Sequence, residues 1–294
     1  MAWWQISLRC PADALEQVES RLVELGALSI SLADGGDEPI FEPLPGEMPV
    51  WPESIVTGTF AANLDPESLQ QQLLASLPTA LGSSLRLTKL QEQDWEQAYR
   101  MHFKPLQCAD NLWIVPSWCE PPEHSATIIT LDPGLAFGTG THATTALCLA
   151  WIAEHALEDR DLIDYGCGSG ILAIAACKLG AASVSAVDID PQAVQATESN
   201  LKANHIGIDQ FFLGMPDDLA EQSADFLVAN ILAGPLVDLA ARFANLVKPG
   251  GKIMLSGILK TQLNEIQSAY QSSFALDPPR LREEWAGLSG TRIG

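Results

Sequence analysis

The chain has 294 residues, of which 47% are hydrophobic and 18% charged, enough apolar material for one large domain or two of ordinary size. Its 16 lysines and arginines are outnumbered by 37 aspartates and glutamates, which gives a formal charge of −21 at pH 7. A surface of this sign repels the phosphates of nucleic acids and anionic membranes and attracts basic partners, so we expect no direct contact with nucleic acid.

The sequence shows no sign of secretion, membrane insertion or metal binding. Its first residues, MAWWQISLRC, lack a basic start followed by an apolar stretch, and no segment approaches the roughly 20 apolar residues of a membrane span. The six cysteines form no C-x-x-C pair, so neither a zinc site nor a disulfide framework is indicated. We therefore expect a reduced, soluble protein of the cytoplasm. Separately, we expect a monomer.

The first 90 residues alternate between strand-like and helical patterns. Leu15, Val18 and Leu22 recur at helical spacing, and Asp65 followed by Pro66 is typical of a helix start. The order is β-α-β-β-α-β, that of the ferredoxin-like split fold, which we assign to an N-terminal domain at residues 1–91. The strand-like runs are residues 3–9, 28–33, 54–62 and 84–90, and the helical runs are residues 12–25 and 65–78.

The pattern changes after a predicted linker helix at residues 92–105. Within residues 106–294, apolar strand-like runs (IDYG, VSAVDID, DFLVANI, KIMLSGI) alternate with helical runs. This alternation predicts a doubly wound, mostly parallel α/β sheet, whose ligand lies at the carboxyl ends of the strands.

In the N-terminal domain, the loop at residues 34–53 carries six acids and no base, so it is either a solvated connection or a contact for a basic partner.

A glycine turn and an acid indicate a nucleoside ligand at that edge. Gly166, Gly168 and Gly170 follow a strand that ends at Asp164, with G-x-G-x-G spacing in place of the dinucleotide pattern. The next strand ends in Asp188, 22 positions after Gly166, where a carboxylate accepts hydrogen bonds from ribose hydroxyls. Any tight strand-to-helix turn explains the glycines alone, but the two features together favour a nucleoside.

The neighbouring residues narrow the choice of nucleoside. Asp164 precedes the glycine turn directly and suits a ligand with an amino group better than one with a pyrophosphate. This favours S-adenosylmethionine over a nicotinamide dinucleotide, and titration with the two cofactors would separate the enzyme classes. Asn230 ends the fourth strand at the same edge and offers an amide oxygen and nitrogen, unless it only caps a turn.

The segments D-x-G-x-G-x-G (residues 164–170), Asp188, the Asn230 loop and VKPGGKIMLSG (residues 247–257) resemble those of class I methyltransferases. The segment DPGLAFGTGTHATT (residues 132–145) is more specific and resembles the signature of the ribosomal protein L-eleven (L11) methyltransferases, the PrmA family. The resemblance extends over the whole chain. It implies a seven-stranded sheet and a small N-terminal domain that recognises the substrate.

By the same resemblance the cofactor is S-adenosylmethionine, and the substrate is the basic ribosomal protein, free rather than assembled in the ribosome. Its N-terminal α-amine and certain lysines would each be trimethylated. We expect Asn230 to orient the amine as the catalytic residue, Thr141 to cap a helix, and His142 to be structural. The residues expected to bind the cofactor are Thr145, Gly166, Gly168, Asp188 and Asn230.

Two other functions remain open from the sequence. A class I methyltransferase acting on another protein or a metabolite amine would carry the same cofactor motifs. A ferredoxin-like RNA-binding module is less favoured, because SIVTGTF lacks the aromatic pattern of an RNA-recognition strand. The run Asn230-Ile231-Leu232-Ala233 replaces the N-P-P-Y of glutamine and adenine methyltransferases, which argues against planar amide or base substrates.

Overall fold

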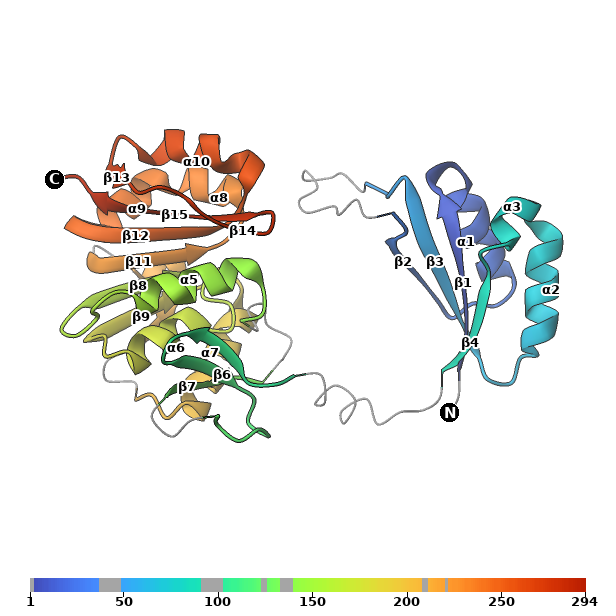
Figure 1. The fold of residues 1–294 in the computed structure, drawn as a ribbon, viewed down its shortest axis with the longest axis horizontal. Helices are drawn as coiled ribbons and strands as arrows, with labels where there is room; N and C mark the ends of the chain where they lie inside the picture. Colours follow the sequence, from blue (N-terminus) through green and yellow to red (C-terminus); the bar gives the residue numbers. More distant parts are fainter. Residues whose placement is uncertain are drawn as a thin grey trace. The chain divides into compact units, whose positions relative to one another are not determined.

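A computed structural model shows two compact units, Met1–Tyr99 and Arg100–Gly294, which are described separately (Figure 1). Most of the acidic loop at 34–53 and of the expected linker helix at 92–105 lies outside the described residues, so those predictions stay open. The structure describes residues 3–36, 49–90, 103–122, 126–132, 140–207, 211–219 and 222–294.

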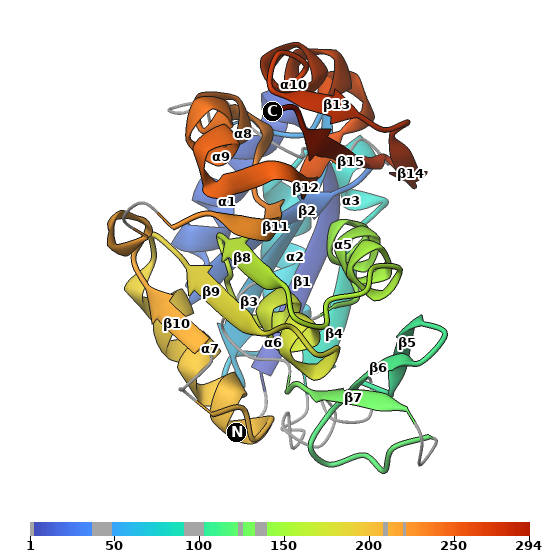
Figure 2. The ribbon, with the colours of Figure 1, turned by 90° about the vertical axis from the view of Figure 1, so that its left-hand side faces the viewer.

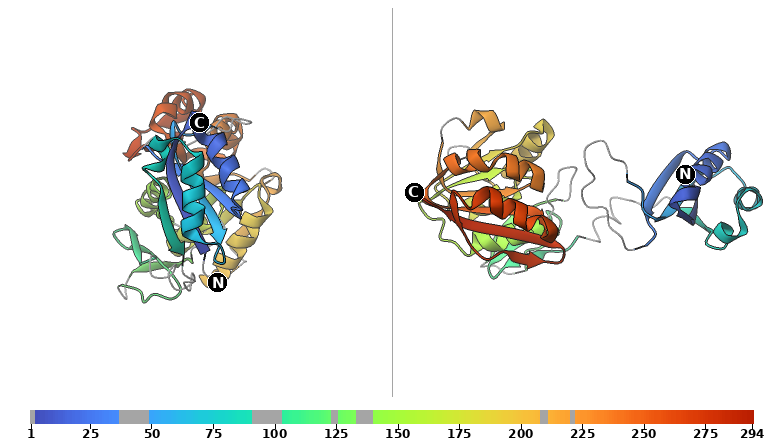
Figure 3. Two further views of the ribbon diagram at one scale, coloured as in Figure 1. Left: turned by 90° about the vertical axis from the view of Figure 1, so that its right-hand side faces the viewer. Right: turned by 90° about the horizontal axis from the view of Figure 1, so that it is seen from above.

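The N-terminal unit is a four-stranded antiparallel sheet in the order β2-β3-β1-β4, with helices on one face (Figure 3). This order confirms the ferredoxin-like prediction. Its core lies between the sheet and the two longer helices, α1 and α2. The elements are β1 (Trp3–Pro11), η1 (Ala12–Ala14), α1 (Leu15–Glu24), β2 (Ser29–Asp34), β3 (Glu53–Ala61), α2 (Pro66–Ser76), α3 (Thr79–Gly82) and β4 (Arg86–Leu90).

Local sequence explains these elements. Ile6 and Leu8 alternate with more exposed residues along β1 and are buried against the helices, as a strand with one covered face requires. The α1 residues Val18 and Leu22, one turn apart, are fully buried on the facing side. Helix α2 begins where predicted, because the Asp65 carboxylate accepts hydrogen bonds from the first free backbone N–H groups of the helix.

The second unit is built on a seven-stranded path in the order β10-β9-β8-β11-β12-β15-β13, and β14 pairs with β15 (Figure 2). Neighbouring strands from β10 to β12 are parallel, whereas β15 runs antiparallel to β12 and β13. The predicted mostly parallel sheet is confirmed. The strands are β8 (Asp161–Tyr165), β9 (Ser183–Val187), β10 (Phe211–Gly214), β11 (Ala224–Asn230), β12 (Val247–Leu259), β13 (Phe274–Leu276), β14 (Arg280–Arg282) and β15 (Trp285–Arg292).

Helices cover both faces of this sheet, as the doubly wound arrangement requires; Figure 2 shows α5 and α8 on opposite sides. Successive residues of β8, Leu162 and Ile163, enter two different hydrophobic cores, one on each face. One core contains residues of α5 (Ala143–Ala153), α6 (Ile171–Lys178) and α7 (Pro191–Ala203), and the other residues of α8 (Ala233–Asp238), α9 (Ala240–Leu246) and α10 (Leu263–Tyr270). The 3-10 helices are η3 (Pro216–Asp218) and η4 (Lys260–Gln262).

A separate three-stranded sheet, which the sequence did not predict, precedes the main one. It consists of β5 (Leu106–Ala109), β6 (Leu112–Val115) and β7 (Thr127–Thr130). The buried Asn204 side chain attaches it to the end of α7, because its amide accepts from the Thr130 N–H at 2.8 Å and donates to the Thr130 carbonyl at 2.7 Å.

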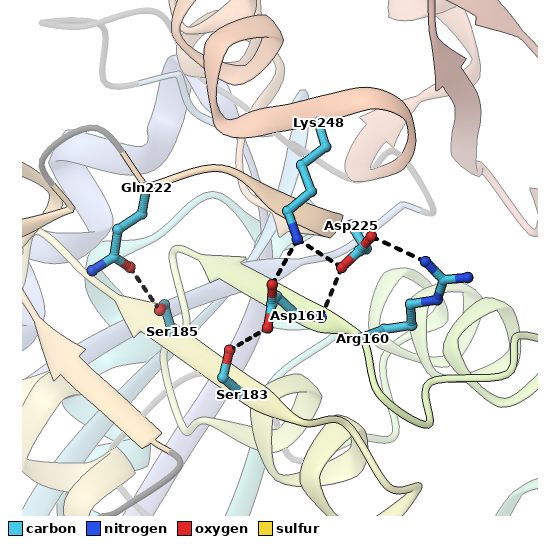
Figure 4. Close-up of polar contacts among 7 residues, drawn as sticks. All are labelled: Arg160, Asp161, Ser183, Ser185, Gln222, Asp225 and Lys248. Atoms are coloured by element: carbon cyan, nitrogen blue, oxygen red, sulfur yellow. Dashed lines mark hydrogen bonds and ion pairs between the residues drawn. The ribbon is translucent and has the colours of Figure 1, made fainter.

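An ion-pair network joins the amino ends of the parallel strands (Figure 4). The Lys248 ammonium of β12 lies 2.7 Å from a carboxylate oxygen of Asp161 in β8 and 3.0 Å from one of Asp225 in β11. Arg160 adds a second cation to Asp225 at 3.3 Å. This network lies at the edge opposite to the one where the sequence predicts the ligand.

None of the helices in the described part of the chain combines the length and the apolar character that crossing a lipid bilayer requires.

Candidate active site

The carboxyl ends of β8, β9 and β11 bring the predicted site residues together, because parallel strands all end at one edge of a sheet. Asp188 follows β9 directly and contacts the glycine turn after β8. Asn230 is the last residue of β11 and contacts Thr145 of α5. Residues from four elements, far apart in the sequence, thus form one site.

The glycine turn packs tightly against both neighbouring strands. The Gly166 N–H donates to the carbonyl of Val187, the last residue of β9, at 2.8 Å. On its other side, a Cβ atom at Gly166 would lie only 2.3 Å from the Ile231 side chain, and the backbone there has a positive φ of 80°. Only glycine fits this position without moving its neighbour.

Asp188 shapes the turn and retains acceptor capacity. One of its carboxylate oxygens accepts from the Gly168 N–H at 2.9 Å, and the other from the Asp190 N–H at 2.9 Å. Each carboxylate oxygen has a second lone pair, so this half-buried group is able to accept further hydrogen bonds from a ligand. The Asp190 carboxylate instead caps α7 by accepting from the Gln192 N–H.

Asp164 is a buried carboxylate with an unsatisfied oxygen. Its side chain is fully buried; Oδ2 accepts from the Ala173 N–H at 3.0 Å, and Oδ1 has no hydrogen-bond partner among the described residues. Burial, and to a smaller extent the negative charge of Asp188, raises the pKa of Asp164 to about 7. An unpaired buried carboxylate is costly, and a cationic ligand group would compensate it. This environment fits the ammonium group of S-adenosylmethionine.

Thr145 and Asn230 meet where α5 starts. The Asn230 Nδ2 group donates to the hydroxyl oxygen of the fully buried Thr145 at 3.3 Å. The expected helix cap at Thr141 is wrong, because α5 begins at Ala143 and its N-cap is His142, whose ring nitrogen accepts from the Thr144 N–H.

The His142 ring also packs edge-on against Trp285, with ring centroids 4.9 Å apart. Capping and ring packing together explain this histidine without any chemical role. They support the structural interpretation that the sequence suggested.

Three large apolar side chains at the same edge were not identified from the sequence as ligand contacts. Ile189, Leu232 and Met215 follow β9, β11 and β10, and they are 79%, 57% and 38% exposed. Their position directly after strand-ending residues was the available signal. Exposed apolar residues around polar groups are typical of a ligand site and would suit an adenine ring.

The strand order, the glycine turn, the acid after β9 and the buried carboxylate together define a class I methyltransferase that uses S-adenosylmethionine. The comparison with known proteins is more specific. The model of the ribosomal protein L11 methyltransferase (PrmA) family matches residues 2–293, and the chain belongs to this family. Part of the glycine- and threonine-rich segment that indicated it, residues 133–139, lies outside the described residues.

Similar proteins match the chain from end to end. It is 47% identical to the ribosomal protein L11 methyltransferase of Nitrosococcus oceani, with 99% of this chain and 100% of the relative covered, and 47% identical, with the same coverage, to that of Azotobacter vinelandii. The crystal structure of a ribosomal protein L11 methylase from Lactobacillus delbrueckii subsp. bulgaricus matches with a TM-score of 0.60 and 37% identity, covering 65% of this chain and 100% of that one.

Proposed function

We propose that this protein transfers methyl groups from S-adenosylmethionine to ribosomal protein L11, trimethylating its N-terminal α-amine and certain lysines. The observation that carries the proposal is the match to the family model at residues 2–293, together with relatives of that name covering 99% of the chain. A net charge of −21 favours a basic protein as substrate and disfavours approach to ribosomal RNA. This charge favours free L11 over L11 in the ribosome as the substrate. The location in the cytoplasm and the monomeric state of the enzyme are further parts of the proposal.

Each site residue has a proposed role toward the cofactor. Asp188 accepts from the ribose hydroxyls, and Gly166 and Gly168 let the backbone of the turn approach the ligand. Asp164 pairs with the ammonium group, and Thr145 and Asn230 contact the cofactor from α5 and β11. When bound, S-adenosylmethionine supplies a methyl group activated by a positively charged sulfur.

The amine needs alignment more than a general base. At pH 7 exposing the lone pair of a lysine with an ordinary pKa costs about 4.6 kcal/mol, and of an α-amine about 1 to 1.4 kcal/mol. Burial in the site lowers the pKa of the amine, and correct alignment can supply roughly 7–11 kcal/mol of the barrier. Both deprotonation free energies are smaller than the part of the barrier that alignment can supply. Residues that orient the amine should therefore determine the rate more than a general base does.

Asn230 is the proposed orienting residue. Because its Nδ2 group donates to Thr145, its Oδ1 atom is the one presented to accept a hydrogen bond from the amine N–H. The backbone carbonyls of the following residues, Ile231 and Leu232, add further acceptors. With no aromatic residue in this loop, a flexible amine suits the site better than a planar amide or base.

Mass mapping of purified L11 after incubation with the protein and S-adenosylmethionine tests the function. We expect methyl groups on the N-terminal amine and on lysines, and unmodified L11 would contradict the proposal.

Asn230→Ala should lower kcat about 100-fold, because the amine loses its alignment, while the fold is retained. The matched control is Asn264→Ala, at an exposed position on α10, which should leave kcat unchanged. Equal turnover in the two variants would remove Asn230 from the mechanism.

A further inference from the structure

Strand β12 contains a β-bulge next to the candidate active site. Its pairing with β15 slips between Leu255 and Ile258, so that Ser256 and Gly257 together lie opposite a single residue, Gly287. Gly257 has a positive φ of 84°, a backbone conformation that residues other than glycine rarely adopt. Bulges bend a strand and change the direction of its side chains, and they are frequent beside active sites.

The absence of a side chain at Gly257 makes room for the loop after β11. A Cβ atom here would lie 2.2 Å from the carbonyl oxygen of Ile231 and 2.8 Å from its carbonyl carbon. These are backbone atoms, which cannot rotate away, so any side chain would displace the Ile231 peptide. Gly166 lies similarly close to the side chain of the same residue. Ile231 is therefore packed between two glycines.

The other bulge residue connects β12 to the start of α5. Ser256 lies beside Asn230 in the parallel register of β11 and β12, and its hydroxyl donates to the Thr144 carbonyl at 3.1 Å. The next residue of α5, Thr145, accepts the hydrogen bond from the Asn230 amide. The bulge thus contacts the residues next to the two partners of this hydrogen bond, Ile231 after Asn230 and Thr144 before Thr145.

We propose that the Ser256–Gly257 bulge is a positioning element for methyl transfer. Gly257 admits the Ile231 peptide and Ser256 holds the first turn of α5, so that the Asn230 amide is directed at the incoming amine. Neither bulge residue touches the amine or the cofactor. The inference rests on the proposed role of Asn230 and adds the residues that orient it.

The test compares two glycines of the same strand. Gly257→Ala should lower kcat for L11 methylation about 100-fold and raise the Kd for S-adenosylhomocysteine far less, because the alignment of the amine is lost whereas Asp164 and Asp188 still hold the cofactor. Gly250 has a similar positive φ of 77° but nothing within 4 Å of its Cβ position, so Gly250→Ala imposes the same backbone strain without the collision. That variant should retain the wild-type kcat. Equal values of kcat in the two variants would overturn the proposal.

A second pair of variants covers the case in which Gly257→Ala does not fold. Ser256→Ala should lower kcat about tenfold, an effect of order 1.4 kcal/mol on alignment, and should change the Kd for S-adenosylhomocysteine by a smaller factor. Ser289→Ala removes another buried hydroxyl, one on β15 that donates to the Asp277 carboxylate. This variant should leave kcat unchanged. The proposal fails if Ser256→Ala and Ser289→Ala have the same kcat.

The side-chain amide signal of Asn230 in an NMR spectrum reports on the bulge without any substrate. It should shift in Ser256→Ala and not in Ser289→Ala, and an unshifted signal in both would overturn the proposal. This readout separates the two hypotheses: unmethylated L11 with the wild-type enzyme contradicts the proposed function, while the amide signal still decides whether the bulge orients Asn230.

Discussion

Asp164 is the residue whose charge state depends most on what occupies the site. With its pKa raised to about 7, first by burial and then by Asp188, the ligand-free protein holds this carboxyl protonated below neutral pH. Above neutral pH it is an ionised group with one oxygen unpaired among the described residues. A bound ammonium group would favour the ionised form and lower the pKa again.

Cofactor affinity should therefore depend on pH. Below about pH 7 the Kd for S-adenosylhomocysteine should rise by up to about tenfold per pH unit, because Asp164 must first release a proton. Asp164→Asn should bind weakly with no such slope, and calorimetric titrations across this pH range would measure both. The same slope in the variant would show that another group controls binding.

The raised pKa of Asp164 also makes the stability of the ligand-free protein depend on pH. The folded form binds a proton that the unfolded form has released, between the ordinary aspartate value of about 3.9 and about pH 7. The contribution of Asp164 to the free energy of unfolding therefore falls as pH rises through this window.

At the scale of the elements, the two edges of the parallel sheet have different functions. The carboxyl ends carry the candidate active site, and the amino ends carry the network of Lys248, Asp161 and Asp225 (Figure 4). The hydrogen bond from Lys248, and then that from Ser183, lowers the pKa of Asp161, which stabilises the folded protein at neutral pH. Since these side chains are 20–40% exposed, solvent screens much of the interaction.

Lys248→Met should lower the free energy of unfolding by about 1 kcal/mol at pH 7, because the aliphatic stem is kept and the ion pairs are lost. An acid with a lowered folded pKa contributes stability above its unfolded pKa and loses it as pH falls through the folded value. The difference in free energy of unfolding between Lys248→Met and the wild type should thus be smaller at acidic pH than at pH 7. Urea unfolding at an acidic pH and at pH 7 would measure it. A change in kcat would contradict the separation of the two edges.

Elements with local signals were predictable from the sequence. The strand pattern of β1 and the helix start at Asp65 depend on neighbours within a few positions, and the structure confirms both. The sheet with β5 to β7 was missed, because strands of four residues carry too little periodicity.

Site features that depend on distant residues were not predictable. The ring of His142 packs on Trp285, and the unpaired oxygen of Asp164 depends on how completely the folded chain buries it. The close contact of Gly257 with Ile231 likewise joins two strands that are adjacent only in the folded sheet. The sequence identified which residues lie at the edge, but their partners required the structure.

At the scale of the whole molecule, each unit has its own hydrophobic core, so the N-terminal unit is available for a separate task. We propose that residues 1–91 recognise the substrate, joined through residues 92–105 to the catalytic domain at 106–294. Residues 1–90 contain 12 acids and 4 bases, a charge that suits a basic ribosomal protein.

Deleting residues 1–90 should abolish methylation of intact L11, because the catalytic unit alone cannot hold it. Binding of S-adenosylhomocysteine should persist, since every proposed cofactor residue lies in the second unit. Mass spectrometry of L11 and calorimetry of the truncated protein would measure the two effects. Full activity of the truncated enzyme would assign substrate recognition to the second unit.

The central claim is that the adenosyl donor binds at the carboxyl ends of β8, β9 and β11, with its ribose on Asp188. Calorimetric titration of S-adenosylhomocysteine into the wild type, Asp188→Ala and Asp190→Ala tests it most directly. Losing a charged hydrogen-bond acceptor should weaken binding to Asp188→Ala about 10- to 100-fold. Asp190→Ala, which loses only a helix cap worth about 1 kcal/mol of stability, should bind as the wild type does. Wild-type affinity in Asp188→Ala, or no heat of binding at all, would contradict the account.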